Sequence, residues 1–224
     1  NEHYHSTKGA RTESQHIFID MGLKASPAAT PRVLEIGFGT GLNAWLTLEE
    51  AERSRRNIHY IGLELYPLDW QTVEQLGYIS SDEQLTIHRK QTTTDEQFTP
   101  NEEKQQSAIE LFKQLHTSPW EKDVQLTPHF TLRKIETDVN KWRVENSPFN
   151  LVYFDAFAPE KQPEMWSQEL FNRLYVLLDR DGILTTYCAK GVVRRMLQTA
   201  GFTVERLPGP PGGKREILRA RKQE

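Results

Sequence analysis

Cysteine, long hydrophobic runs and a basic leader segment are all scarce or missing in this sequence. The 224-residue chain has a single cysteine, Cys188, which excludes an internal disulfide and leaves too few thiolates for a metal cluster. No apolar stretch approaches the roughly 20 residues of a membrane-spanning helix, and no basic and then apolar leader begins the chain. We therefore expect a soluble, cytoplasmic protein with no metal and no membrane contact, in which Cys188 is an inert core thiol.

An excess of basic residues is missing as well. The chain has 28 Lys and Arg against 31 Asp and Glu, a net charge of −3 at pH 7, which argues against a protein that coats nucleic acid through bulk electrostatic attraction. Local basic faces remain candidates, although each of them is more often a solvated surface. They are Arg53, Arg55 and Arg56; Arg194 and Arg195; and Lys214, Arg215, Arg219, Arg221 and Lys222.

Length and hydrophobic content predict one well-buried domain that spans residues 1–224. With 37% hydrophobic residues, the chain can build one core with an insertion, and it is too short for two large domains. Residues 1–30 form a polar N-terminal extension that ends in a loop containing Pro27 and Pro31. Residues 78–129 form a polar insertion, which we predict to be mostly helical, with an amphipathic helix near residues 107–115.

The beginning of the core has the pattern of a βαβ unit. Residues 33–36 are a short apolar run, and the glycine loop 37–41 follows it directly. Residues 42–51 have helical spacing of apolar residues, and residues 58–63 form a second apolar run. Strand, loop, helix and strand in this order predict the right-handed unit from which doubly wound sheets are built.

The rest of the chain continues this alternation and then departs from it. We predict strands at 130–135, 151–154 and 183–189, helices at 168–178 and 192–200, and a turn at 181–182. Residues 202–207 and 216–220 are two further strands without room for a helix between them, so they must be antiparallel. A mostly parallel α/β sheet closed by an antiparallel hairpin resembles the Rossmann-like fold of class I S-adenosylmethionine-dependent methyltransferases.

The glycine loop carries the first sign of a ligand. Gly37, Gly39 and Gly41 allow tight turns and close approach of a ligand to the backbone. The dehydrogenase pattern GxGxxG would place its third glycine at position 42, one residue later than it stands here. The GxGxG form, with the acid Glu35 two residues before it, resembles an adenosylmethionine loop, and a generic strand-to-helix turn is the alternative.

Two acids follow predicted strands and extend this site. Glu64 ends the second strand, where a carboxylate can accept hydrogen bonds from both hydroxyls of a ribose. Asp138 follows the third strand, within reach of an adenine amino group in the same geometry. For either residue, a surface acid at the start of a loop is the alternative interpretation.

Asp155 is the candidate catalytic residue. It ends the fourth predicted strand, beside the first, and therefore faces the crevice where strand order reverses and ligands bind. An alkylammonium, with a pKa of about 10.4 in lysine, is protonated at neutral pH. A carboxylate can orient such an amine and carry its proton away, which frees the lone pair for methylation. Capping of the following turn is the alternative role.

The loop after Asp155 offers groups for a nucleic-acid substrate. Phe157 can stack on a nucleobase or pack in the core, and Lys161 can hold a phosphate. Glu164, Met165 and Trp166 are expected to anchor the loop to the body of the protein.

At this point the chain resembles a known family, the MnmC methyltransferase domain and its stand-alone MnmD relatives. These bacterial enzymes complete 5-methylaminomethyl-2-thiouridine at the wobble position of transfer RNA. The most specific matching segment is FDAFAPEKQPEMW at 154–166, and GFGTGLN at 37–43 also matches. Other matching segments are residues 4–6, 13–18, 64–68, 191–195, 200–202 and 213–216.

The resemblance implies a set of functional residues, with Asp155 as the catalytic one. The cofactor S-adenosyl-L-methionine would contact Tyr4, Glu35, Gly37, Phe38, Gly39, Gly41, Asn43, Glu64, Asp138 and Asp155. The transfer RNA anticodon loop would contact Phe157, Lys161, Arg194, Arg195, Lys214 and Arg215. Tyr4 and the segment around Glu13 would fold back over the site.

The resemblance has gaps. Ala156, Gln162 and Glu164 are mild departures from the family pattern, and the insertion 78–129 matches little. The flavin-dependent oxidase domain fused to some relatives is absent from this sequence. The expected reaction is therefore methylation of an aminomethyl uridine, thiolated or plain, that separate enzymes supply.

Two other functions remain as alternatives. Aminopropyltransferases of the spermidine synthase kind share the fold, but Thr40 stands where their glycine loop would carry an acid. A non-catalytic RNA-binding module is the alternative from another class, and it would require neither Asp155 nor the glycine loop.

Overall fold

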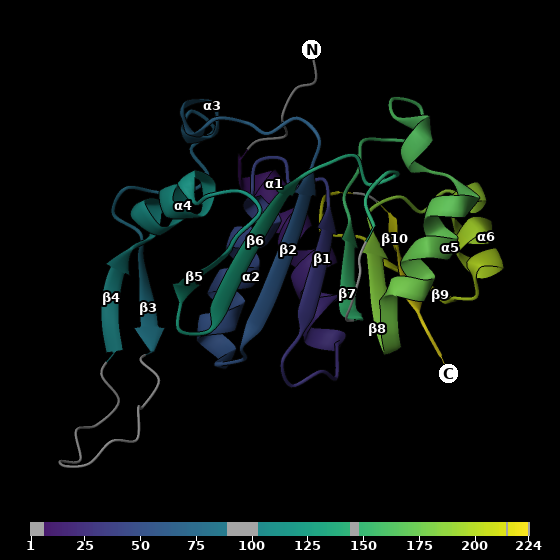
Figure 1. Ribbon diagram of the computed structural model, residues 1–224, viewed down its shortest axis with the longest axis horizontal. Helices are drawn as coiled ribbons and strands as arrows, with labels where there is room; N and C mark the ends of the chain where they lie inside the picture. Colours follow the sequence, from purple (N-terminus) through teal and green to yellow (C-terminus); the bar gives the residue numbers. More distant parts are fainter. Residues whose placement is uncertain (1–6, 89–102, 144–147, 214, 224) are drawn as a thin grey trace.

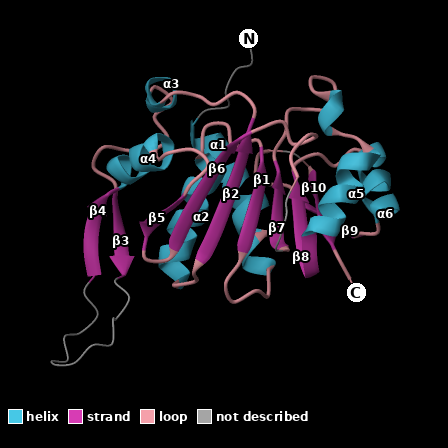
Figure 2. Cartoon of the chain, viewed as in Figure 1, coloured by secondary structure: helices cyan, strands magenta, loops and turns pink. Residues whose placement is uncertain are grey.

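A mixed sheet with helices on both faces forms the body of the protein (Figures 1 and 2). The structure is a computed structural model, and it describes residues 7–88, 103–143, 148–213 and 215–223. The eight strands lie in the order β5-β6-β2-β1-β7-β8-β10-β9. Their bounds are β1 (Arg32–Ile36), β2 (Ile58–Glu64), β5 (Asp123–Thr127), β6 (Phe130–Glu136), β7 (Phe149–Phe154), β8 (Leu178–Thr186), β9 (Thr203–Pro208) and β10 (Glu216–Arg221).

The centre of the sheet is parallel and its two edges are antiparallel. Strand β1 pairs in parallel with β2 and β7, β2 with β6, and β7 with β8. Strand β10 runs antiparallel to both β8 and β9, and β5 runs antiparallel to β6. This arrangement confirms the predicted parallel sheet with an antiparallel C-terminal hairpin, and it places the fourth predicted strand beside the first.

The helices lie in two layers, one on each face. On one face are α1 (Thr7–Ser14), the π-helical turn η1 (Gln15–Asp20), the 3-10 turn η2 (Leu23–Ala25) and α2 (Leu42–Ser54). On the other are α5 (Gln168–Leu177) and α6 (Gly191–Ala200), at the right of Figure 1. Successive residues Val33 and Leu34 of β1 enter the two different cores, as strand alternation requires. None of the described helices is long and apolar enough to cross a membrane.

Local signals explain where the helices of the second layer begin and end. The Ser167 side chain accepts a hydrogen bond from the Leu170 backbone N–H and so caps α5. Helix α6 ends at Gly201, whose φ of 111° suits only glycine. Cys188 is 5% exposed, which confirms its predicted place in the core.

The turn predicted at residues 181–182 is wrong. These residues lie within β8, where the pairing with β7 shifts register between Phe149 and Leu151. Asp181 has a φ of 60°, and its backbone N–H is bonded to the Lys222 carbonyl. The turn-like dipeptide therefore forms an irregularity inside a strand, and Lys222, which follows β10, is hydrogen-bonded to both of its residues.

In its described residues the insertion 78–129 has more strand than helix, which corrects the prediction of a mostly helical segment. It contains β3 (Gln84–His88) and β4 (Glu103–Ser107), which form a separate two-stranded antiparallel hairpin, and also β5. The predicted helix is present as α4 (Ala108–Thr117). The hairpin lies beside the main sheet in Figure 1. Strand β4 is wholly polar, whereas β3 alternates polar and apolar residues and contributes Leu85 and Ile87 to the core on the α2 face.

The N-terminal extension is part of the core rather than an appendage. Ile17, Phe18, Ile19 and Leu23 are at most 2% exposed. The Phe18 ring lies 5.1 Å from that of Tyr153 in β7. Burial of such side chains stabilises the fold by about 1.5–3 kcal/mol each, so the extension is held firmly against the sheet.

Replacing Phe18 tests this role. We expect Phe18→Ala to lower the free energy of unfolding by about 3 kcal/mol, because it leaves a cavity against Tyr153. Val176→Ala is the matched control, since Val176 is 75% exposed and its loss should change stability by less than about 0.5 kcal/mol. Urea denaturation followed by circular dichroism measures both, and equal midpoints for the two variants would contradict the assigned role.

Candidate functional site

The candidate site lies at the carboxyl ends of β1 and β7, where strand order reverses. Strand β2 continues the sheet on one side of β1, and β7 continues it on the other. The Asp155 backbone N–H donates to the Ile36 carbonyl at 3.2 Å, so the loops after the two strands begin side by side. A Cβ atom at Gly37 would lie 3.2 Å from the Asp155 carbonyl oxygen. The open α/β sheet thus brings two predicted site segments together.

The glycine loop has the backbone geometry that its sequence predicts. Gly37, Gly39 and Gly41 have φ values of 88°, 51° and 68°, which side chains other than glycine rarely adopt. The backbone N–H groups of Gly37 and Phe38 both donate to the Leu63 carbonyl, at 3.1 and 2.9 Å. Around Gly39 there is open space, since the nearest atom to an added Cβ is 3.9 Å away. The middle of the loop is therefore open to a ligand.

Glu64 ties the glycine loop to the end of β2. Its Oε2 accepts a hydrogen bond from the Gly39 N–H at 2.8 Å, and its Oε1 accepts from Leu65 and Tyr66, both at 2.9 Å. A carboxylate has about four acceptor positions, so these contacts leave about one for a ligand hydroxyl. Glu64 both shapes the loop and offers a negative charge next to it.

A buried amide connects two further acids. The Asn43 Nδ2 atom donates to Glu35 Oε1 at 2.8 Å and to Asp155 Oδ2 at 2.9 Å. Burial raises the pKa of Glu35 well above its usual value, and the charges of Asp155 and Glu64 add to this, while the hydrogen bond from Asn43 opposes it. Of the two acids that Asn43 binds, Glu35 is fully buried and Asp155 is half-buried.

Asp138 lies at the same edge of the sheet and organises its own turn. Its Oδ1 accepts from the Asn140 N–H at 2.9 Å, and its Oδ2 pairs with Lys141 at 3.4 Å. The neighbouring Thr137 N–H donates to the Glu64 carbonyl at 2.8 Å, which brings the ends of β6 and β2 together. A contact between Asp138 and an adenine stays a prediction.

The loop after Asp155 is anchored at its base and exposed at its tip. The Trp166 indole N–H donates to the Phe157 carbonyl at 2.7 Å, and the Tyr187 hydroxyl donates to the Ala156 carbonyl at 2.8 Å. Met165 and Trp166 are buried, as predicted for anchors, whereas Glu164 is exposed. The Phe157 side chain is 63% exposed, so core packing is excluded.

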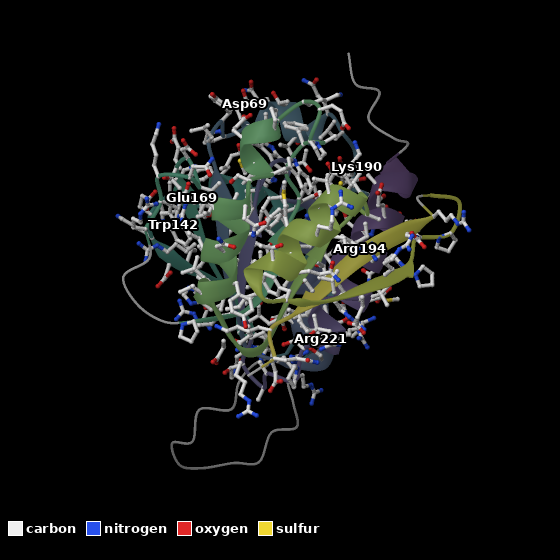
Figure 3. The ribbon with its side chains drawn as sticks, turned by 90° about the vertical axis from the view of Figure 1, so that its right-hand side faces the viewer. Asp69, Trp142, Glu169, Lys190, Arg194 and Arg221 are labelled. Carbon is white, nitrogen blue, oxygen red and sulfur yellow. The ribbon has the colours of Figure 1, made fainter. Side chains whose placement is uncertain are left out.

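The structure separates the candidate basic faces by what their side chains bind. Several are bound to acids or to backbone carbonyls: Arg53 to Glu50, Arg56 to the carbonyls of Leu23, Ser26 and Ala28, Arg219 and Arg221 to Glu205, and Lys222 to the carbonyl of Leu178. Arg195 and Arg215 are exposed and Arg194 is half-buried. Lys190, which precedes α6, pairs with Glu160 of the loop after Asp155. Figure 3 shows Lys190 and Arg194 on the same side of the molecule.

Some predictions fall outside these contacts. Tyr4 and Lys214 lie outside the described residues. Lys161 is exposed, and nothing tests its predicted phosphate contact. Among the described residues no group of three His, Cys, Asp or Glu side chains could hold a metal ion.

Sequence reasoning missed two bases close to the glycine loop, the half-buried His116 and the buried Lys134. The His116 Nε2 atom lies 2.9 Å from the Thr40 carbonyl oxygen, and burial lowers the pKa of His116 to about 4. Lys134 donates to the His116 carbonyl, and burial lowers its pKa to about 8. No motif marks either residue, because their partners are backbone carbonyls distant in sequence.

Comparisons with known proteins agree with this geometry. The model of a protein family described as S-adenosyl-L-methionine-dependent methyltransferase matches residues 99–223. The tRNA 5-methylaminomethyl-2-thiouridine biosynthesis bifunctional protein MnmC of Cupriavidus metallidurans is 30% identical over 225 residues, which cover 97% of this chain and 31% of that protein. The protein of the same name from Magnetococcus marinus is 31% identical, over 97% of this chain and 30% of its own length. The chain thus spans about a third of these relatives.

Solved structures support the fold. MnmC2 from Aquifex aeolicus superposes with a TM-score of 0.64 at 21% identity, over 93% of this chain and 59% of that one. The N-methyltransferase NodS from Bradyrhizobium japonicum gives a TM-score of 0.51 at 13% identity, over 97% and 96%. With the sequence matches, these confirm the predicted resemblance and the class I fold.

The lowered pKa of His116 predicts a change of stability with pH. The unfolded chain binds a proton at this residue near pH 6.5, whereas the folded protein resists protonation until about pH 4. The stabilising contribution of the neutral His116 side chain is therefore fully present above about pH 6.5 and is lost as the pH falls toward 4. We expect the difference in unfolding free energy between wild type and His116→Gln to change by about 2 kcal/mol over this interval. Urea titrations at several pH values measure it, and a constant difference would contradict the assignment.

Proposed function

The chain belongs to a family of S-adenosyl-L-methionine-dependent methyltransferases, and from this premise we propose that it N-methylates a uridine of transfer RNA. The substrate in this proposal is 5-aminomethyluridine, or its 2-thio form, at the wobble position, and the product is the 5-methylaminomethyl uridine. The names of the MnmC relatives, which match nearly the whole chain, support this substrate. Family membership also favours methyl transfer over aminopropyl transfer and over RNA binding without turnover.

The observation that carries the proposal is the position of Asp155 beside the glycine loop, with its carboxylate hydrogen-bonded to Asn43. The substrate amine is protonated at neutral pH and must lose a proton to expose its lone pair. The Asp155 carboxylate, with Oδ2 fixed by Asn43 at 2.9 Å, can bind the ammonium and accept that proton directly or through water. Its negative charge also stabilises positive charge that develops on the nitrogen.

The residues around the glycine loop fit S-adenosyl-L-methionine, which when bound supplies a methyl group on a positively charged sulfonium. The backbone at Gly39 is open on the side that a ligand would approach. Glu64 accepts hydrogen bonds only from backbone N–H groups among the described residues, so its charge is available to complement a cation. In this proposal Glu35, Gly37, Phe38, Gly41, Asn43 and Asp138 complete the cofactor site.

Exposed and half-buried side chains suit contact with an RNA loop. Phe157 presents its ring to solvent, where it can stack on a base. Arg194 and Arg195 lie at the beginning of α6, and Lys161 and Arg215 are exposed, which gives phosphate partners despite the negative net charge. In this proposal separate enzymes supply the aminomethyl uridine, and the reaction takes place in the cytoplasm.

We also propose that residues 1–224 act as one methyltransferase domain. The extension 1–30 contributes core residues to it, and the insertion 78–129 packs α4 against α2 and the glycine loop. Neither segment has a core separate from that of the sheet.

Replacing Asp155 tests the proposed reaction. We expect Asp155→Asn to reduce methyl transfer by about 10²- to 10⁴-fold, because the amide cannot accept the proton, while cofactor affinity changes little. The assay is labelled methyl transfer to transfer RNA from cells blocked at the aminomethyl stage, with mass spectrometry of the nucleosides. Asp181→Asn is the control. Asp181 lies in the amino-terminal half of β8, toward the end of the strands opposite the candidate site, and Asn tolerates its φ of 60°. Full activity of Asp155→Asn would refute the catalytic role, and no product from the wild type would refute the substrate.

Replacing Gly39 tests the cofactor site. Gly39 and Gly77 have similar φ values, 51° and 61°, and open surroundings. Both Gly→Val changes should therefore cost similar stability. Only Gly39→Val should weaken binding of S-adenosyl-L-methionine, by at least about tenfold, since its side chain would occupy the ligand face. Isothermal titration calorimetry measures this, and equal affinity of the two variants would show that the cofactor binds elsewhere.

A further inference from the structure

The insertion contacts the proposed cofactor site through one side chain. His116 lies in the last turn of α4, and its Nε2 atom is 2.9 Å from the carbonyl oxygen of Thr40, between Gly39 and Gly41. A carbonyl can only accept, so Nε2 carries the hydrogen and donates it. The contact joins residues that are 76 positions apart.

The contact is close as well as polar. A Cβ atom at Gly41 would lie 2.8 Å from His116 Nε2 and 3.0 Å from Leu115 Cδ2. Glycine at position 41 therefore allows α4 to approach the loop. The Phe38 ring, in the same loop, lies 5.8 Å from the His116 ring in an edge-on arrangement.

Two aromatic rings and Lys134 lie close to His116. The rings of Phe112 and Trp70 lie 5.0 and 5.8 Å from the imidazole. Lys134, which is 1% exposed, donates to the His116 backbone carbonyl and lies 4.8 Å from the Trp120 ring. A cation at the carboxyl end of a helix also stabilises the helix dipole, so α4 ends at a fixed point below the loop.

We propose that His116 is a positioning residue for S-adenosyl-L-methionine, whose hydrogen bond to Thr40 holds the glycine loop in its binding conformation. The proposal rests on the cofactor placement argued above. A loop with three glycines has access to many backbone conformations, and ordering it on binding costs entropy. A loop that His116 already holds in place loses less conformational entropy on binding, so this hydrogen bond contributes to affinity although His116 does not contact the ligand.

The effect should appear in cofactor affinity and not in the chemical step. We expect His116→Leu, which keeps the bulk but removes the donor, to raise the dissociation constant for S-adenosyl-L-methionine about tenfold, with kcat at saturating cofactor unchanged. His116→Gln keeps an N–H donor and should restore affinity to within about threefold of wild type. Phe112→Leu is the matched control, because Phe112 packs on His116 from the same helix and makes no contact with Thr40 in the described interactions.

Calorimetric titration of the four proteins, with unfolding measured in parallel, decides the question. Weakened binding in His116→Leu, recovery in His116→Gln and normal binding in Phe112→Leu would establish the role. Normal binding by His116→Leu, no recovery with Gln, or an equal loss in Phe112→Leu would overturn it. Gly39→Val, run beside them, separates the two proposals: if it alone loses affinity, the cofactor site stands and the role of His116 fails, and if it binds normally, both fail.

Discussion

The parallel pairing of β1 with β7 is the constraint on which the site depends. Because of this pairing, β1 and β7 have their carboxyl ends at the same end of the sheet. The hydrogen bond from the Asp155 N–H to the Ile36 carbonyl holds the first residues of the two following loops together. Because Gly37 has no side chain, its loop can turn within contact of Asp155. The glycine loop and Asp155 are therefore neighbours because the strands that precede them are paired. The helical layers on the two faces of the sheet bury these two strands.

The acids at the carboxyl ends of these strands differ in burial and in their hydrogen-bond donors. Glu35 is fully buried and its pKa is raised, so it is favoured as a neutral hydrogen-bonding partner. The Glu64 carboxylate accepts hydrogen bonds from three backbone N–H groups. Asn43 donates to both Glu35 and Asp155 and so links these two acids. Three acids near the carboxyl ends of these strands, Glu35 within β1, Glu64 at the end of β2 and Asp155 after β7, thus differ in burial and in hydrogen-bond donors.

The parts that the sequence predicted are those with strong local signals. Apolar runs that end in glycine or an acid gave the parallel strands, and their order in the chain was enough to place Asp155 beside the glycine loop. The hairpin of the insertion 78–129 escaped prediction because β4 is wholly polar, β3 has only two apolar residues, and the two strands pair with each other outside the main sheet. The buried group 17–19 escaped because it is short and lies in a polar segment, although its side chains are almost fully covered. The exposure of Phe157 depends on tertiary anchoring by Trp166, which no local pattern encodes.

Through His116 and Lys134, the insertion 78–129, which the sequence predicted poorly, contacts the glycine loop, which it predicted well. Both are basic groups held where burial lowers their pKa values, and each keeps a partner: the imidazole has the Thr40 carbonyl, and the ammonium has the His116 carbonyl with the Trp120 ring. An unpaired buried polar group would cost about 1–3 kcal/mol, so these partners are interdependent. Lys134 extends from β6, the second strand from the edge of the sheet, His116 from the inserted helix, and Thr40 from the glycine loop. These two hydrogen bonds therefore connect β6, the insertion and the glycine loop, although the insertion carries little sequence signal.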